Sequence, residues 1–147
     1  FTLSAEQMEA IKLQVIKNDS DDDLRLRKEE SKMRDYVYDT LSMNKIPYEE
    51  SDYLFCFGRE KKQGVFKKVF DVLVVFTNTA MYVFSDMEQT AIRYEILNGV
   101  TFKTATEIEC VNTSGDTFYP FVSDYGERIV GFLSVILDAK KQCLVTK

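Results

Sequence analysis

Two apolar runs on either side of a short polar break decide the fold, in residues 73–84, LVVFTNTAMYVF. The first run starts one residue earlier, and Val72–Phe76 as a whole is consistent with a strand buried on both faces, although an apolar run alone does not establish this. Asn78 and Thr79 then break the pattern as a turn does, and Ala80–Ser85 follows as a second strand. The stretch therefore predicts a β-hairpin near the centre of the chain.

Shorter strands are predicted on both sides of this hairpin. Before it, Tyr53–Arg59 is rich in aromatic residues, and residues 61–64 have the composition of a turn. After it, apolar residues at 92, 94 and 96 alternate with charged ones as in a half-exposed strand, and Asn98-Gly99 is a strong tight-turn dipeptide. Further strands are predicted around Val100, Ile108 and Thr117–Val122. Pro120 places the last of these at an edge or a bulge, because proline cannot donate to a ladder.

Helices are predicted on both sides of the strand region. Ser4 and Gln7 have the spacing of a capping box, and the helix that they begin should end near Asn18. A second helix is predicted over about 24–43, and a C-terminal helix follows Asp124, which can cap it. The order predicts an α+β fold in which two helices precede seven antiparallel strands and a closing helix.

Composition makes a binding module a better expectation than an enzyme. The chain has 147 residues, of which 45% are hydrophobic and 29% charged, which suits one domain or one small domain with an appendage. It contains no histidine, which excludes His-dependent triads, imidazole zinc sites and histidine general bases within it. Glu107 and Glu109 share a predicted strand face, but no nucleophile or base accompanies them, so exposed strand glutamates explain them better. We expect no enzymatic activity and no cofactor.

Charge is distributed unevenly along an acidic chain. The net charge is −5, and an acidic domain repels a polyanion, so we expect no nucleic-acid partner. Residues 53–70 differ, because their only acidic side chain is Glu60. Phosphate groups bind where several ammonium or guanidinium donors converge, and the donors offered here are Arg59, Lys61, Lys62, Lys67 and Lys68. The alternative is a solvated hairpin whose lysines protect a sheet edge.

The cysteines and the longest apolar run bear on location. Cys56, Cys110 and Cys143 are odd in number and form no CxxC motif, so unpaired thiols in a reducing compartment are expected. The run Val72–Phe76 is too short to cross a bilayer, and no signal peptide opens the chain. Because the chain begins with Phe1 and not with Met, we expect a fragment of a larger cytoplasmic protein.

Seven short antiparallel strands followed by one amphipathic helix resemble the pleckstrin-homology-like (PH-like) superfamily. The most specific match is residues 73–84, which look like the hairpin of hydrophobic residues, Thr, a turn, Tyr and further hydrophobic residues common in PH and GRAM domains. The resemblance implies a strongly bent seven-stranded sheet, or partly open barrel, closed at one end by the C-terminal helix. It covers about 53–142. We therefore expect a PH-like domain over 51–147, preceded by a helical hairpin over 1–50.

Two departures from the family bear on function. The closing helix lacks the Trp that PH domains typically carry, and Phe132 is the only aromatic residue within its body. Typical phosphoinositide binders carry a Lys, a variable loop and then Lys/Arg-x-Arg on the second strand. Here Lys67-Lys68 is an adjacent doublet, whose side chains point to opposite faces of a strand, and no Arg follows.

Two functions therefore stay open. The first is a non-catalytic adaptor within a larger protein, in which an exposed sheet edge or the groove beside the closing helix takes a peptide from a protein partner. The second is binding of phosphoinositide headgroups or an anionic membrane surface through the basic segment 59–68. The resemblance to divergent PH-like domains implies peripheral association with a membrane or with the cytoskeleton.

An Asp-rich stretch between the two predicted N-terminal helices has part of the spacing of an EF-hand loop. Positions 1, 3, 5 and 12 of such a calcium loop are occupied by Asp19, Asp21, Asp23 and Glu30. Leu24 stands where the loop needs Gly for its sharp turn, and basic residues at 25, 27 and 28 lie beside the proposed cation. A polar link between helices, with aspartates that cap them, is the favoured interpretation.

Four tyrosines are expected near the junction of the helical arm and the sheet: Tyr36, Tyr38, Tyr48 and Tyr53. Exposed aromatic residues of this kind are common anchors for a protein partner. We favour the other interpretation, in which they hold the arm against the sheet.

Overall fold

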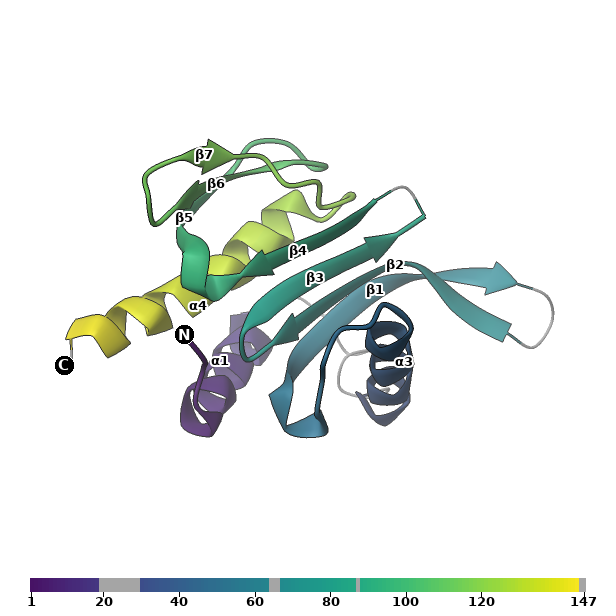
Figure 1. Ribbon diagram of the computed structural model, residues 1–147. Helices are drawn as coiled ribbons and strands as arrows, with labels where there is room; N and C mark the ends of the chain where they lie inside the picture. The colour runs from purple at the N-terminus through teal and green to yellow at the C-terminus, as the bar shows by residue number, and fades with distance from the viewer. Residues whose placement is uncertain (19–29, 64–66, 87, 146–147) are drawn as a thin grey trace.

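The structure, a computed structural model, describes the backbone of residues 1–18, 30–63, 67–86 and 88–145, and the side chains in these ranges other than 15–18, 30–33, 60–63, 67–69 and 143–145. Within these described ranges, two helices come first, seven strands follow, and a long helix comes after the strands (Figure 1). The elements are α1 (Ala5–Asn18), α3 (Glu30–Met43), the short 3-10 helix η2 (Glu50–Asp52), β1 (Tyr53–Gln63), β2 (Lys67–Thr77), β3 (Ala80–Ser85), β4 (Gln89–Arg93), the 3-10 helix η3 (Tyr94–Ile96), β5 (Leu97–Phe102), β6 (Ile108–Asn112), β7 (Thr117–Phe118) and α4 (Gly126–Val145).

The strands divide between two antiparallel sheets, one with the order β1-β2-β3-β4 and the other with the order β5-β6-β7. The sheets do not close into a barrel, and α4 packs across them (Figure 1). The predicted α+β class, the seven antiparallel strands and the C-terminal helix are confirmed.

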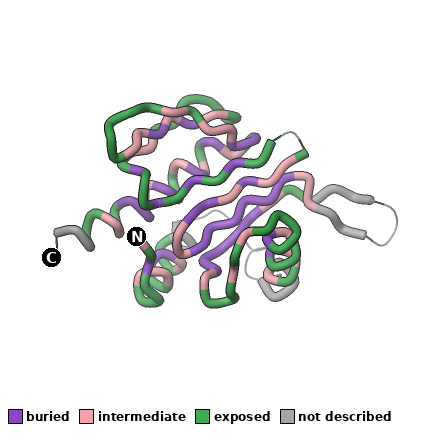
Figure 2. Tube along the Cα trace, viewed as in Figure 1, coloured by how far each residue is buried: buried purple, intermediate pink, exposed green. Residues whose placement is uncertain are grey.

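Strand β2 is buried on both faces, as its apolar run indicated. Val72, Val74 and Phe76 belong to the core beneath α4, whereas Leu73 and Val75 belong to a second core on the opposite face of the sheet. Figure 2 shows the resulting band of buried residues along the four-stranded sheet. Successive side chains of a strand point to opposite faces, so a strand can be apolar at every position only if both faces are covered.

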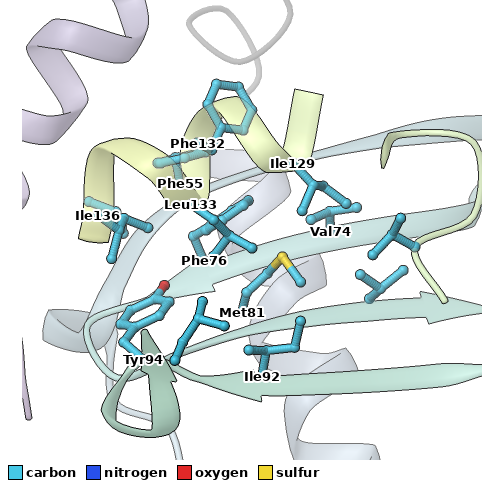
Figure 3. Close-up of a cluster of buried hydrophobic side chains, with 14 of the residues drawn as sticks. Phe55, Val74, Phe76, Met81, Ile92, Tyr94, Ile129, Phe132, Leu133 and Ile136 are labelled. Atoms are coloured by element: carbon cyan, nitrogen blue, oxygen red, sulfur yellow. The ribbon is translucent and has the colours of Figure 1, made fainter. Parts of the chain in front are cut away.

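The inner core joins both sheets to α4. Phe76 stacks on Phe55 with ring centroids 4.6 Å apart, and Phe132 of α4 meets Phe76 edge-on at 5.7 Å (Figure 3). Tyr94 is buried at one end of this core, and its hydroxyl lies 2.8 Å from Thr77 O and 2.9 Å from Ala80 O, so the two carbonyls share its one hydrogen. Aromatic packing of this kind adds to the burial of area, so this cluster fixes α4 on the sheet.

The outer core is formed by α3. Val37 and Leu41 are fully buried against Leu73 and Val75 of β2, and Tyr53 and Cys56 of β1 complete the cluster. The tyrosines expected at this junction divide in their roles. Tyr36 meets Phe70 edge-on at 5.0 Å, and Tyr53 is buried beneath the Arg34 guanidinium, whereas Tyr38 is 54% exposed.

Helix α1 begins and ends where the sequence indicated. Ser4 Oγ accepts from the Gln7 N–H at 3.1 Å, and Gln7 Oε1 accepts from the Ser4 N–H at 2.8 Å, which is the reciprocal capping box. Leu3 and Ile11 are buried in the inner core, near α4 and β1. The two N-terminal helices therefore pack in different cores, on opposite faces of the four-stranded sheet. The predicted start of the second helix at residue 24 lies outside the described residues.

The chain turns from the first sheet to the second earlier than predicted. Strand β4 ends at Arg93, and Tyr94–Ile96 is a 3-10 helix, so the alternation of apolar residues at 92, 94 and 96 does not mark one continuous strand. Asn98-Gly99 is not a turn. It lies in β5 at a β-bulge between Leu97 and Gly99. The physical reason is the burial of Tyr94, because its hydroxyl, shared between the carbonyls of Thr77 and Ala80, holds the backbone at the corner between the sheets.

The basic segment lies mostly within strands and not in a turn. Strand β1 continues through Gln63, so residues 61–63 of the predicted turn lie in a strand, and residue 64 lies outside the described residues. Register pairs Gln63 with Lys67 and Lys62 with Lys68, whereas β3 pairs with β2 only from Val72 onward. The β1–β2 hairpin thus projects as a two-stranded ribbon beyond β3 (Figure 1).

Candidate functional site at the free edge of strand β5

Helix α4 runs alongside β5 in the opposite direction and is fixed to the second sheet at two places. Near its start, the Gly126 N–H donates to Ala105 O at 2.8 Å, and a side chain at Gly126 would collide with the Thr104 and Ala105 carbonyls. Near its end, Lys140 Nζ donates to Tyr94 O at 2.9 Å, Glu95 O at 3.1 Å and Leu97 O at 2.9 Å. These anchors hold the helix beside the first and last residues of β5.

The backbone direction of β6 shows which groups of β5 are paired. The Ile108 N–H donates to Pro120 O, and the Asn112 N–H donates to Asp116 O. The backbone N–H and C=O groups of the even-numbered residues of β6 therefore point away from β5. Consistent with this alternation, the Thr113 N–H donates to Ile96 O, toward the chain that leads into β5. Residues of an antiparallel strand alternate between the two sides. Glu109 and Val111 therefore bond to β5.

It follows that Val100 and Phe102 carry their N–H and C=O groups on the free side of β5. Val100 stands opposite Cys110, and Phe102 stands opposite Ile108, and the backbone groups of these two β6 residues point away from β5. The residues of β5 that stand opposite Glu109 and Val111 are Thr101 and Gly99. Strand β5 pairs with β6 alone among the described strands. Within the described part of the chain, no partner meets these outward groups of Val100 and Phe102. We call this pair, with Thr101 between them, the β5 edge.

The two outward residues of the β5 edge, Val100 and Phe102, have apolar and partly accessible side chains. Val100 packs against the inner core, and Phe102 is 50% exposed, although its cross-strand partner Ile108 is fully buried. On α4, Val130 and Ser134 are half-buried on the flank opposite Phe132, which faces β1. An exposed aromatic side chain beside open backbone donors and acceptors is the combination that a short extended peptide can use.

Two other end strands, β7 and β4, offer less. Strand β7 has two residues and is followed by Pro120. On β4, Thr90 Oγ1 donates across to Phe121 O at 2.6 Å, which ties that strand to the second sheet. Among the described residues, β5 therefore combines the longest run of outward groups in the smaller sheet with an exposed aromatic residue.

Of the predicted phosphate ligands, only Arg59 lies among the described side chains. Its Nη2 is 2.8 Å from Asp71 Oδ2, and its Nη1 is 2.7 Å from Asp124 Oδ2. Hydrogen bonds to Asp71 and then to Asp124 raise the pKa of this guanidinium above its usual value. Asp124, predicted as a helix cap, thus holds Arg59. Nothing is described of the side chains of Lys61, Lys62, Lys67 and Lys68, and their role as phosphate ligands stays a prediction.

The predicted calcium loop falls outside the described side chains, at Asp19, Asp21, Asp23 and Glu30. Among the side chains that are described, no group of three His, Cys, Asp or Glu residues is placed to hold a metal ion. Glu107 and Glu109, weighed as a carboxylate pair, each have another partner. Glu107 Oε1 lies 2.9 Å from Lys103 Nζ, and Glu109 Oε1 accepts from the Tyr119 hydroxyl at 3.3 Å.

The two described cysteines are structural. Cys56 and Cys110 are buried, and burial raises the pKa of the Cys110 thiol to about 12. A thiol with so high a pKa is a poor nucleophile near neutral pH, because the thiolate is the reactive form. The Tyr53 hydroxyl donates to Cys56 Sγ at 3.3 Å within the outer core.

Comparisons of the chain with models of protein families, with curated proteins and with solved structures gave no match. Within the described residues, no helix combines the length and the apolar character needed to cross a membrane.

The sequence pattern did not single out the β5 edge or Lys140. Alternation around Val100 and Phe102 predicted a strand, but a strand's free side depends on which neighbours pair with it, and this is set by the tertiary fold. In the sequence, Lys140 is a cation near the end of the C-terminal helix, a position where its charge favours the helix dipole, and nothing in the spacing points to its acceptors. Its three carbonyl acceptors come from residues more than 40 positions earlier in the sequence.

Proposed function

We propose that the chain is a non-catalytic adaptor module of the PH-like kind, and that it binds an extended peptide segment of a partner protein at the β5 edge. The observation that carries this proposal is the pair of outward residues Val100 and Phe102. Their two N–H and two C=O groups allow a partner strand to form up to four backbone hydrogen bonds. The arrangement of seven antiparallel strands and a closing helix is compatible with a PH-like module, which supports the adaptor role.

The side chains around the edge indicate what the peptide should carry. Alternate side chains of an added strand point to the same face, so every second residue would face α4 near Val130 and Ser134. Phe102 provides apolar contact at the rim. A short segment with apolar residues at alternate positions fits this surface, and the backbone hydrogen bonds tolerate a range of sequences.

A proline substitution tests the proposal. Val100→Pro removes one outward N–H while leaving the bonds to β6 at Thr101 and Gly99, so the fold should persist and peptide binding should weaken by roughly tenfold or more. The probe is a peptide selected from a displayed random library, with affinity measured by titration calorimetry. Val100→Ala is the matched control, because it shortens the side chain and keeps the N–H. Equal affinities of the two variants would contradict the proposal.

A second candidate is binding to an anionic membrane surface, and the projecting ribbon favours it. Residues 60–63 pair with 67–70 beyond the reach of β3, and this ribbon carries Lys61, Lys62, Lys67 and Lys68. A projecting basic ribbon can reach a lipid surface without moving the rest of the fold. Exposed cations contribute to such binding through a field that salt screens.

Liposome sedimentation tests this second candidate and separates the basic residues. Lys61→Glu/Lys62→Glu should abolish sedimentation with phosphoinositide-containing vesicles, and high salt should have the same effect. Arg59→Ala should reduce it far less, because the Arg59 charge is already matched by Asp71 and Asp124. No sedimentation of the unaltered protein at low salt would end the membrane proposal. An Arg59→Ala loss as large as that of the double variant would show that Arg59 leaves its carboxylates to bind lipid.

A further inference from the structure

The β5 edge has a defined limit on one side, at Leu97. Leu97 stands opposite Asn112, whose N–H donates away from β5, so Leu97 is also an outward residue. Its groups are nevertheless in use. The Leu97 N–H donates to Tyr94 O at the end of η3, and Leu97 O accepts from Lys140 Nζ at 2.9 Å. Among the residues of β5 that have a register partner on β6, the outward ones are thus Leu97, whose backbone groups are in use, and Val100 and Phe102, whose backbone groups are open.

Lys140 is suited to keep that position closed. An ammonium group has three donors, and here they reach three carbonyls, those of Tyr94, Glu95 and Leu97. A carbonyl oxygen has a second lone pair, but an approaching N–H would bring its own positive end against the ammonium charge. The charge therefore discourages a further backbone bond at Leu97, as lysines on sheet edges do elsewhere.

We propose that Lys140 fixes the register of the partner peptide by stopping its pairing at Val100. This inference rests on the proposed peptide function and adds to it a specificity-determining residue. The peptide pairs with Val100 and Phe102 and gains no backbone bond at Leu97. Because slipping along β5 would bring a peptide N–H to Leu97 O, the stop selects one alignment of the peptide's apolar side chains against α4.

The test uses peptides selected from a displayed random library, with amide hydrogen exchange measured on both the protein and the bound peptide. In the unaltered protein the amides of Val100 and Phe102 should become protected. Peptides lengthened past Val100, toward Leu97, should bind no more than about twofold tighter, since no acceptor is open there. This length series needs no variant, so it decides the question even if substitution of Lys140 disturbs folding. A steady gain in affinity with each residue added on that side would contradict the proposal that pairing stops at Val100.

Three variants extend the test. Lys140→Met should free Leu97 O, protect one further peptide amide and tighten the lengthened peptides about fivefold. Lys140→Arg can still donate to carbonyls and should protect the same amides as the unaltered protein. Lys141→Met, a substitution at the exposed neighbouring lysine, should also leave the set of protected amides unchanged. If Lys140→Met protects the same amides as the unaltered protein, including those of Val100 and Phe102, the proposal that Lys140 fixes the register is wrong, and the proposal of peptide binding is supported. If no peptide protects the amides of Val100 and Phe102 in any variant, the proposed peptide binding is wrong, and so is the proposal that Lys140 fixes the register.

Discussion

Replacing Phe76 with alanine should lower the free energy of unfolding by roughly 3–5 kcal/mol, the loss typical of a fully buried phenylalanine in a packed core. Phe76 is 0% exposed and contacts rings on two elements, Phe55 on β1 and Phe132 on α4. The truncation would leave a cavity where the sheet meets the closing helix. Chemical denaturation followed by circular dichroism measures the change.

The control is the same substitution at an exposed ring. Phe102→Ala should cost less than about 1 kcal/mol, because a half-exposed side chain loses little burial. If the two variants lost equal stability, the core would not lie between β2 and α4 as described.

The second large effect is expected on the opposite face of the sheet. Leu41→Ala should lower the free energy of unfolding by roughly 2–5 kcal/mol, because Leu41 of α3 is fully buried against the β1–β2 pair. The inner and outer cores share strand β2, so we expect the loss to appear in one cooperative transition and not in a separate melting of α3. Thermal unfolding monitored by far-ultraviolet and near-ultraviolet circular dichroism tests this.

Leu13 gives the comparison for Leu41, since it is a helical leucine that is 63% exposed. Leu13→Ala should change stability by less than about 0.5 kcal/mol. Two resolved transitions in Leu41→Ala, with the sheet unaffected, would contradict the description of α3 as the cover of the outer face. The expected boundary near residue 50 would then mark a separable unit.

The apolar run of β2 shows how far local sequence determines this fold. Five consecutive apolar residues require cover on both sides of a strand, and the structure provides α4 on one face and α3 on the other. The capping box at Ser4 and Gln7 likewise needed only local chemistry, and it is present in both directions. These features are predictable because their causes lie within a few residues of one another.

The corner at Tyr94 and the candidate site depend on distant residues. Tyr94 ends a strand-like pattern because its hydroxyl reaches Thr77 and Ala80, and no spacing near residue 94 encodes those partners. The free side of β5 is fixed by hydrogen bonds of β6 to the chain around β7. Arg59 is similar, because Asp124, one of its two carboxylates, lies 65 positions away. The sequence therefore predicts Arg59 as a cation of the basic segment, but it does not predict the ion pairs with Asp71 and Asp124.

Amide hydrogen exchange in the free protein tests the central claim, that one side of β5 is open, most directly. The N–H groups of Gly99 and Thr101 bond to β6 and should exchange slowly, whereas those of Val100 and Phe102 point outward and should exchange rapidly. Measured by NMR on the labelled protein, this alternation along three consecutive residue steps requires no knowledge of the partner. Slow exchange at Val100 and Phe102 in the absence of any peptide would contradict the account, because it would show that another part of the chain already occupies the edge.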